Sequence, residues 1–192
     1  MIKSNKLKRF LLIHLLCTIL VACAAYKPGR VLAPQLVDGI TCTSEDICID
    51  DVSRIQKASE LYRSAVEFVT SAVGHFEKAP RIVFCSTQAC FQSFGFNQAS
   101  AHAVGKSGII IGPRGWTSHY VRHEMIHYRQ AEELGVLNQW LGPKWFIEGM
   151  AYSLSDDPRQ PLSHPWQQYR AEFDAWYQGI GKENLWREAR SL

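Results

Sequence analysis

The sequence predicts one α+β domain over residues 47–192, and three of its features carry that prediction. A stripe of apolar residues at helical spacing runs from residue 52 to 76 and indicates a long amphipathic helix. Short apolar runs bounded by Gly and Pro predict strands at 80–85, 100–104 and 107–111. Beyond residue 116 the pattern is helical almost to the end. A small antiparallel or mixed sheet should therefore be followed by a mostly helical C-terminal part.

Residues 1–22 are expected to be a lipoprotein signal peptide that is removed. A basic start precedes the apolar run 10–22, which has the length of a signal peptide and is short for a membrane span. The run ends in L-V-A-C, which resembles a bacterial lipobox with Cys23 as the lipidated residue. An ordinary secretory signal, cut at one of the neighbouring alanines, is the alternative.

The lipobox resemblance implies an address in the bacterial cell envelope. Several acyl chains on Cys23 would anchor the protein firmly in a membrane. Ala24 after the cysteine resembles the signal for delivery to the outer membrane, facing the periplasm. Residues 23–46 are expected to be a tether, because Pro and Gly interrupt them and no periodicity follows.

The charge of the chain argues against nucleic acid as a partner. The whole chain has 21 basic and 18 acidic residues, and the segment 1–22 contains four basic residues and no acidic one. Its removal leaves 17 basic residues against 18 acidic ones. A near-neutral chain without a run of Lys or Arg gives no indication of nucleic-acid binding.

Four cysteines remain after the signal peptide and the lipidation site. Their spacing suggests two local disulfides, although four cysteines allow three pairings, and free buried thiols are the alternative. Disulfides suit an exported protein. The suggested pairs are Cys42–Cys48 and Cys85–Cys90.

The remaining elements follow from capping and turn residues. Asp50 and Asp51 can start the helix at 52–76, and Ser86 can cap a short helix over 87–94. A helix is expected from residue 117 or 118 to Gly135, where glycine ends it. Two further helices are expected at 165–179 and 184–190.

The strongest functional signal is an H-E-x-x-H pattern at 123–127. Residues four apart lie on one face of a helix, so the imidazoles of His123 and His127 can bind one zinc ion. Glu124 can then act on a zinc-bound water without being a ligand. The alternative is a helix that carries these residues as a solvated polar face.

A second segment supports the metal interpretation. The sequence W-F-I-E-G-M-A at 145–151 follows Pro143, which suits the first turn of a helix. If this helix returns antiparallel to the first, Glu148 faces the two histidines as a third ligand. Gly149 would then permit a close backbone approach.

These two segments resemble the gluzincin group of zinc metallopeptidases. The resemblance covers roughly residues 100–155 and implies a zincin-like fold with one Zn²⁺ per chain and Glu124 as general base. This chain is short, has no exopeptidase-type motif for a free amino terminus, and has no room for a second catalytic domain. The implied zinc ligands are His123, His127 and Glu148.

The resemblance also gives a role to the predicted hairpin at 100–111, with Gly105 and Lys106 as its tight turn. In zincins the strand at the cleft edge binds an extended substrate as an added strand. Residues 101–104 or 108–111 would supply that edge. An ordinary hairpin is the alternative.

Two supporting roles stay open at this point. Gluzincins need a Tyr or His that stabilises the oxyanion of the tetrahedral intermediate; His164 and Tyr169 are favoured, with Tyr152 and Tyr177 as further candidates. Asp156 or Asp157 could orient a ligating imidazole, although placement on the surface or at a helix N-terminus is as compatible with the sequence.

The sequence thus predicts a zinc-dependent peptidase, lipid-anchored in the cell envelope, that acts on peptides or unfolded proteins. A zinc amidase or hydrolase acting on cell-wall peptides is the second hypothesis. A non-catalytic envelope lipoprotein that keeps the fold for binding is the third, and the intact Glu124 argues against it.

Overall fold

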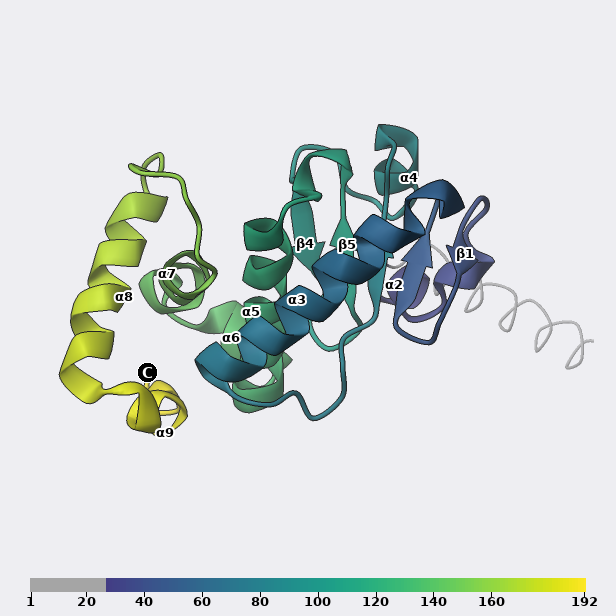
Figure 1. Cartoon of the computed structure of the whole chain (residues 1–192). Helices are drawn as coiled ribbons and strands as arrows, with labels where there is room; N and C mark the ends of the chain where they lie inside the picture. The colour runs from purple at the N-terminus through teal and green to yellow at the C-terminus, as the bar shows by residue number, and fades with distance from the viewer. Residues whose placement is uncertain (1–26) are drawn as a thin grey trace, which may run out of the picture.

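The computed structural model describes residues 27–192, so the expected signal peptide and Cys23 lie outside the described residues. Within residues 27–192, no helix is long and apolar enough to cross a membrane. The chain is an α+β domain, as expected, with a small mixed sheet of five strands in the order β1-β2-β3-β5-β4 (Figure 1).

The three central strands are parallel, and the two outer strands run antiparallel to their neighbours. The strands predicted from the sequence are present as β3, β4 and β5, although each is shorter than expected. Strands β1 and β2 were not predicted, because two or three residues are too few to show an alternating pattern. The strands are β1 (Thr41–Cys42), β2 (Ile47–Ile49), β3 (Ile82–Phe84), β4 (Ala101–Ala103) and β5 (Ile109–Ile111).

The predicted helices are also present, with small shifts at their ends. The long helix α3 is preceded by a 3-10 turn at Val52–Arg54, which Asp51 caps by accepting a hydrogen bond from the Ser53 N–H. Helix α4 is capped by Thr87 instead of Ser86. The helices are α2 (Lys27–Leu32), α3 (Ile55–Val73), α4 (Gln88–Ser93), α5 (Ser118–Leu134), α6 (Val136–Leu141), α7 (Lys144–Leu154), α8 (Trp166–Ile180) and α9 (Leu185–Ala189).

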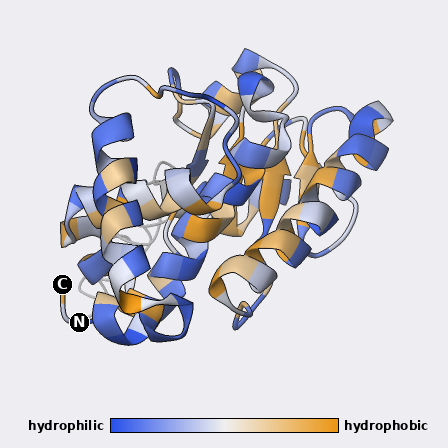
Figure 2. Ribbon diagram, turned by 60° about the vertical axis from the view of Figure 1, so that its left-hand side comes forward, coloured by the Kyte–Doolittle hydropathy of each residue, from blue (hydrophilic) through white to orange (hydrophobic). Residues whose placement is uncertain are grey.

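Both faces of the sheet are covered. Ile82, Phe84 and the corresponding residues of β2 and β5 face α3 and α5 and form the main core with them. Val83 and Ile110 point to the opposite face, where α2 and α4 pack. The central strands are therefore apolar at every position, and Figure 2 shows them among the most hydrophobic segments of the protein.

The described part of the expected tether belongs to the domain, so the prediction of a tether over 23–46 is wrong from residue 27 onward. Helix α2 buries Val31 completely, and its side chain lies against Gly108 beside the sheet. Strand β1 then pairs with β2. Pro28 and Gly29, which suggested a tether, lie in α2, and Pro34 begins a short 3-10 helix at Pro34–Leu36; the contacts of Val31 hold the segment in place.

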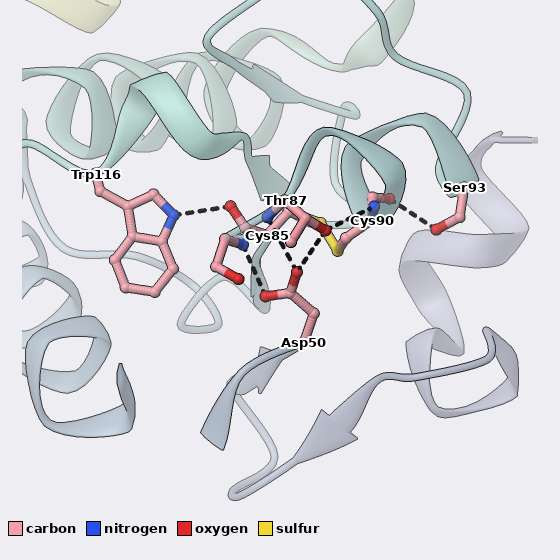
Figure 3. Close-up of a disulfide and its surroundings, with 7 residues drawn as sticks. Asp50, Cys85, Thr87, Cys90, Ser93 and Trp116 are labelled. Atoms are coloured by element: carbon pink, nitrogen blue, oxygen red, sulfur yellow. Dashed lines mark hydrogen bonds between the residues drawn. A yellow bond between two sulfur atoms is a disulfide. The ribbon is translucent and has the colours of Figure 1, made fainter. Parts of the chain in front are cut away.

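Both suggested disulfides are formed, Cys42–Cys48 and Cys85–Cys90. The first links the paired strands β1 and β2. The second ties the end of β3 to α4, where the Asp50 carboxylate accepts hydrogen bonds from the backbone N–H groups of Ser86 and Thr87 (Figure 3). Trp116, just before α5, donates its indole N–H to the Cys85 carbonyl over 2.8 Å. These contacts fix the connection that leads from the sheet into α5.

Candidate metal centre

Helices α5 and α7 bring three potential metal ligands to one point. On α5, His123 and His127 lie one turn apart, with 3.1 Å between their Nε2 atoms. On α7, Glu148 places Oε2 3.8 Å from His123 Nε2 and 3.6 Å from His127 Nε2. The predicted convergence of these three side chains is therefore present in the structure.

The triangle of donor atoms has the size that a zinc site requires. Zinc lies about 2.0–2.1 Å from His nitrogen and carboxylate oxygen, so the donors of a tetrahedral site are about 3.4 Å apart. The three measured separations, 3.1, 3.6 and 3.8 Å, bracket that value. Two imidazoles and one carboxylate fit a zinc ion, and this donor set leaves a fourth position for water or substrate.

Glu124 stands beside the three ligands and is held by the sheet. The residue is 7% exposed, and its Oε2 accepts a 2.7 Å hydrogen bond from the backbone N–H of Ala103 on β4. Burial raises the pKa of Glu124 to about 7. A carboxyl group with a pKa near neutrality can both accept and donate a proton at working pH.

The pKa values of the three candidate ligands depend on one another. Burial and the neighbouring His127 lower the pKa of His123 to about 3, which keeps its ring neutral. Burial would also lower the pKa of His127, but the adjacent Glu148 carboxylate outweighs burial and raises it. The pKa of Glu148 is in turn lowered, because the hydrogen bond and charge of His127 outweigh its burial. Ionised Glu148 and neutral His123 are in forms that bind a divalent cation, whereas His127, with its raised pKa, must release a proton to do so.

The four residues line one cleft of about 1000 Å³. One wall is the segment 98–107, which contains β4 and the hairpin turn, and the other is formed by α6 and α7. Tyr120, Arg159 and Trp166 line the cleft near Tyr152, and Val136 and Trp140 line it near the hairpin turn at Gly105. The candidate ligands therefore face an open, partly aromatic cleft.

Strand β4 is the edge of the sheet and forms this wall, whereas β5 lies between β3 and β4. Of the two segments expected to supply the edge, 101–104 is consistent with the structure and 108–111 is wrong. In the antiparallel ladder Val104 donates to Gly108 and Gly112 donates to Ser100. The backbone groups of the alternate residues, Ala101 and Ala103, therefore point away from β5 to the free edge.

The structure does not bring the two favoured oxyanion candidates into the cleft. Neither His164 nor Tyr169 is among the residues that line it, and Tyr169 packs its carbonyl oxygen where a Cβ of Gly149 would lie. Tyr152 does line the cleft, and its ring centroid is 4.5 Å from that of His123. It lies one helical turn after Glu148 on α7, a spacing visible in the sequence.

The aspartates considered as partners of a ligating imidazole have other partners. Asp156 pairs with Arg122 at 3.0 Å, and Asp157 pairs with Arg159. The hydrogen-bond partner of His127 is Gln130, whose Oε1 lies 2.8 Å from His127 Nδ1. This contact was missed in the sequence, although the spacing H-x-x-Q on one helix could have pointed to it.

Comparison with known proteins gives no assignment: no protein-family model, no curated protein and no solved structure matches this chain.

Proposed function

We propose that this protein is a zinc-dependent peptidase with a zincin-like arrangement of its sheet and metal helices. The observation that supports it most is the convergence of His123, His127 and Glu148 at tetrahedral spacing, with Glu124 beside them in an open cleft. A purely structural metal site has four protein ligands and is closed. Three donors beside a free carboxylate favour a catalytic site.

In this proposal each residue has a separate task. Zinc at the site would lower the pKa of a bound water and polarise the scissile carbonyl. Glu124 accepts the proton of that water and later donates it to the leaving amine. The Ala103 N–H holds the Glu124 carboxylate in place during both transfers.

Tyr152 is our candidate for the oxyanion. Burial raises its pKa to about 12, so the phenol stays protonated and can donate a hydrogen bond at neutral pH. Its ring packs against His123, which keeps it next to the reacting centre. A donor placed there would stabilise the negative oxygen of a tetrahedral intermediate.

The cleft favours an extended peptide or unfolded protein as substrate. The free edge of β4 offers the N–H and C=O of Ala101 and the C=O of Ala103 to an added strand, while the Ala103 N–H is taken by Glu124. On the opposite wall, Val136 and Trp140 offer apolar surface to side chains. In the proposed setting, lipidated Cys23 anchors the enzyme in the bacterial envelope.

One experiment tests both halves of the proposal. In Glu148→Ala we expect zinc to be lost or much weakened, because one of three ligands is gone. In Glu124→Gln we expect about one zinc ion per chain to remain, while cleavage of casein or a peptide library falls about 10²- to 10⁴-fold with the loss of the general base. Zinc is measured by atomic spectrometry on the purified protein.

A surface carboxylate supplies the control. Glu60 lies on the exposed side of α3, far along the chain from the metal helices, so Glu60→Gln should retain both zinc and cleavage. Unchanged cleavage in Glu124→Gln would refute the assigned base. Wild-type protein that binds no zinc would refute the enzyme proposal as a whole.

A further inference from the structure

The side chain of Gln130 is completely buried between the two metal helices. It lies on α5, three residues after His127, and both ends of its amide are engaged. The Nε2 group donates to the carbonyl of Ile147 on α7 over 2.9 Å, and Oε1 lies 2.8 Å from His127 Nδ1. Gln130 therefore contacts a candidate ligand on one helix and the residue directly before Glu148 on the other.

These contacts determine which nitrogen of His127 carries a proton. A backbone carbonyl can only accept, so the Gln130 amide must point its NH₂ group at Ile147 and its oxygen at His127. An oxygen in that place can only accept, so His127 Nδ1 must carry the hydrogen. When the ring loses its second proton to bind a metal, the lone pair is on Nε2, the atom that faces His123 and Glu148.

We propose that Gln130 is the positioning residue of the metal site: it fixes the tautomer and ring angle of His127 and ties that ligand to the helix of Glu148. This inference rests on the proposed zinc site and assigns to it a partner that the ligand motif does not include. Metal-binding histidines commonly donate their second N–H to such a partner.

A residue of helix α6 also holds His127, through its backbone. Gln139 donates its Nε2 to the His127 backbone carbonyl over 2.6 Å and lies 3.5 Å from Gln130 Oε1. The backbone and the ring of His127 are thus held by two different glutamines. Of the two glutamines, only Gln130 contacts the imidazole.

The test measures zinc affinity by competition with a chelator, independently of any cleavage assay. Gln130→Met keeps a buried side chain of similar length but removes the acceptor, and we expect zinc affinity to fall about 10- to 100-fold. Gln130→Glu restores an acceptor for His127 Nδ1 while it loses the donor to Ile147, so its affinity should stay within a few-fold of wild type. Gln56→Met, on the exposed side of α3, is the matched control and should stay close to wild type.

The outcomes separate the alternatives. If Gln130→Met binds zinc as tightly as wild type, or if Gln130→Glu loses as much affinity as Gln130→Met, Gln130 does not act through the imidazole and the inference is wrong. If wild-type protein itself binds no zinc, the proposed function fails first.

A spectroscopic measurement on the wild-type protein covers the case in which Gln130→Met does not fold. In the zinc-loaded protein, long-range ¹H–¹⁵N correlation should show His127 protonated at Nδ1 and coordinated through Nε2. A His127 protonated at Nε2, or coordinated through Nδ1, would overturn the inference without any variant.

Discussion

The side chain of Asp157 is 1% exposed, and its carboxylate accepts hydrogen bonds from one residue, Arg159. Arg159 donates its backbone N–H over 3.0 Å and its Nε over 2.9 Å, and its Nη1 reaches the hydroxyl of Tyr120 at the cleft end. Burial would raise the pKa of Asp157, but these hydrogen bonds outweigh it and hold the pKa below its usual range. Asp157 therefore holds in place Arg159, which lines the candidate cleft together with Tyr120.

Asp157→Asn should make the protein less stable at neutral pH. Because the pKa of Asp157 is lower in the folded state, its contribution to stability is present above its ordinary pKa and is lost as the pH falls through the folded-state value. We expect a loss of about 1.5 kcal/mol at pH 7, in the lower range for hydrogen bonds to a charged group, since Arg159 is partly exposed. Urea denaturation at pH 7 and below about pH 4 measures the difference.

The neighbouring Asp156→Asn is the control for that prediction. Its ion pair with Arg122 leaves 75% of the Asp156 side chain exposed, so its removal should change the free energy of unfolding by less than about 0.5 kcal/mol. A deficit in Asp157→Asn that stays constant into acid would show that the ion pair is not its source.

At the scale of elements, the sequence allowed good predictions where a periodic pattern is long or where a glycine, proline or capping residue marks its end. Helix α5, which carries the two candidate histidine ligands, begins and ends at the residues expected, because Gly135 stops it. Strand β1 and helix α6 were missed, since they are too short for periodicity and exist through contacts with β2 and α5. Gln130 was missed for a related reason: its role depends on the Ile147 carbonyl, which the fold supplies from another helix.

Gly149 was expected to permit a close backbone approach, and the structure identifies the partner as α8. A Cβ at this position would lie 2.2 Å from the Tyr169 carbonyl oxygen and 2.8 Å from Phe173 Cβ. Gly149→Ala should therefore push α7 and α8 apart and cost about 1–3 kcal/mol, which exceeds the gain of roughly 1 kcal/mol from helix propensity. Thermal unfolding measures stability, and zinc titration reports any displacement of the adjacent Glu148.

Gly179→Ala on α8 gives the opposite expectation. A Cβ there has no atom within 4 Å, so the substitution should stabilise the protein by up to about 1 kcal/mol through helix propensity alone. Equal behaviour of the two alanine variants would contradict the packing argument.

At the scale of the whole molecule, the cleft brings together segments that the sequence could not place side by side. The hairpin wall comes from 98–107, the apolar rim from α6, and the aromatic end from Tyr120 and Trp166. A Cβ on Gly105 would lie 3.1 Å from Val136, so the hairpin turn and α6 meet at one end of the groove. The ligand motif predicted the centre of the site, whereas its walls depend on how the helices fold back on the sheet.

The apolar rim gives the last prediction. Helix α6 exposes several large apolar side chains, and among them Trp140, which is 72% exposed, lines the cleft, whereas Leu137, at 65%, does not. If substrate lies in the groove, Trp140→Ala should raise KM for apolar peptides several-fold, because a contact of this size contributes about 1 kcal/mol or more. The zinc content and kcat should stay unchanged, since Trp140 is not a candidate ligand.

Leu137→Ala removes a comparably exposed apolar side chain outside the groove and should leave KM as it is. If both variants change KM equally, α6 binds through its general apolar surface; if neither does, the substrate does not cross this end of the cleft.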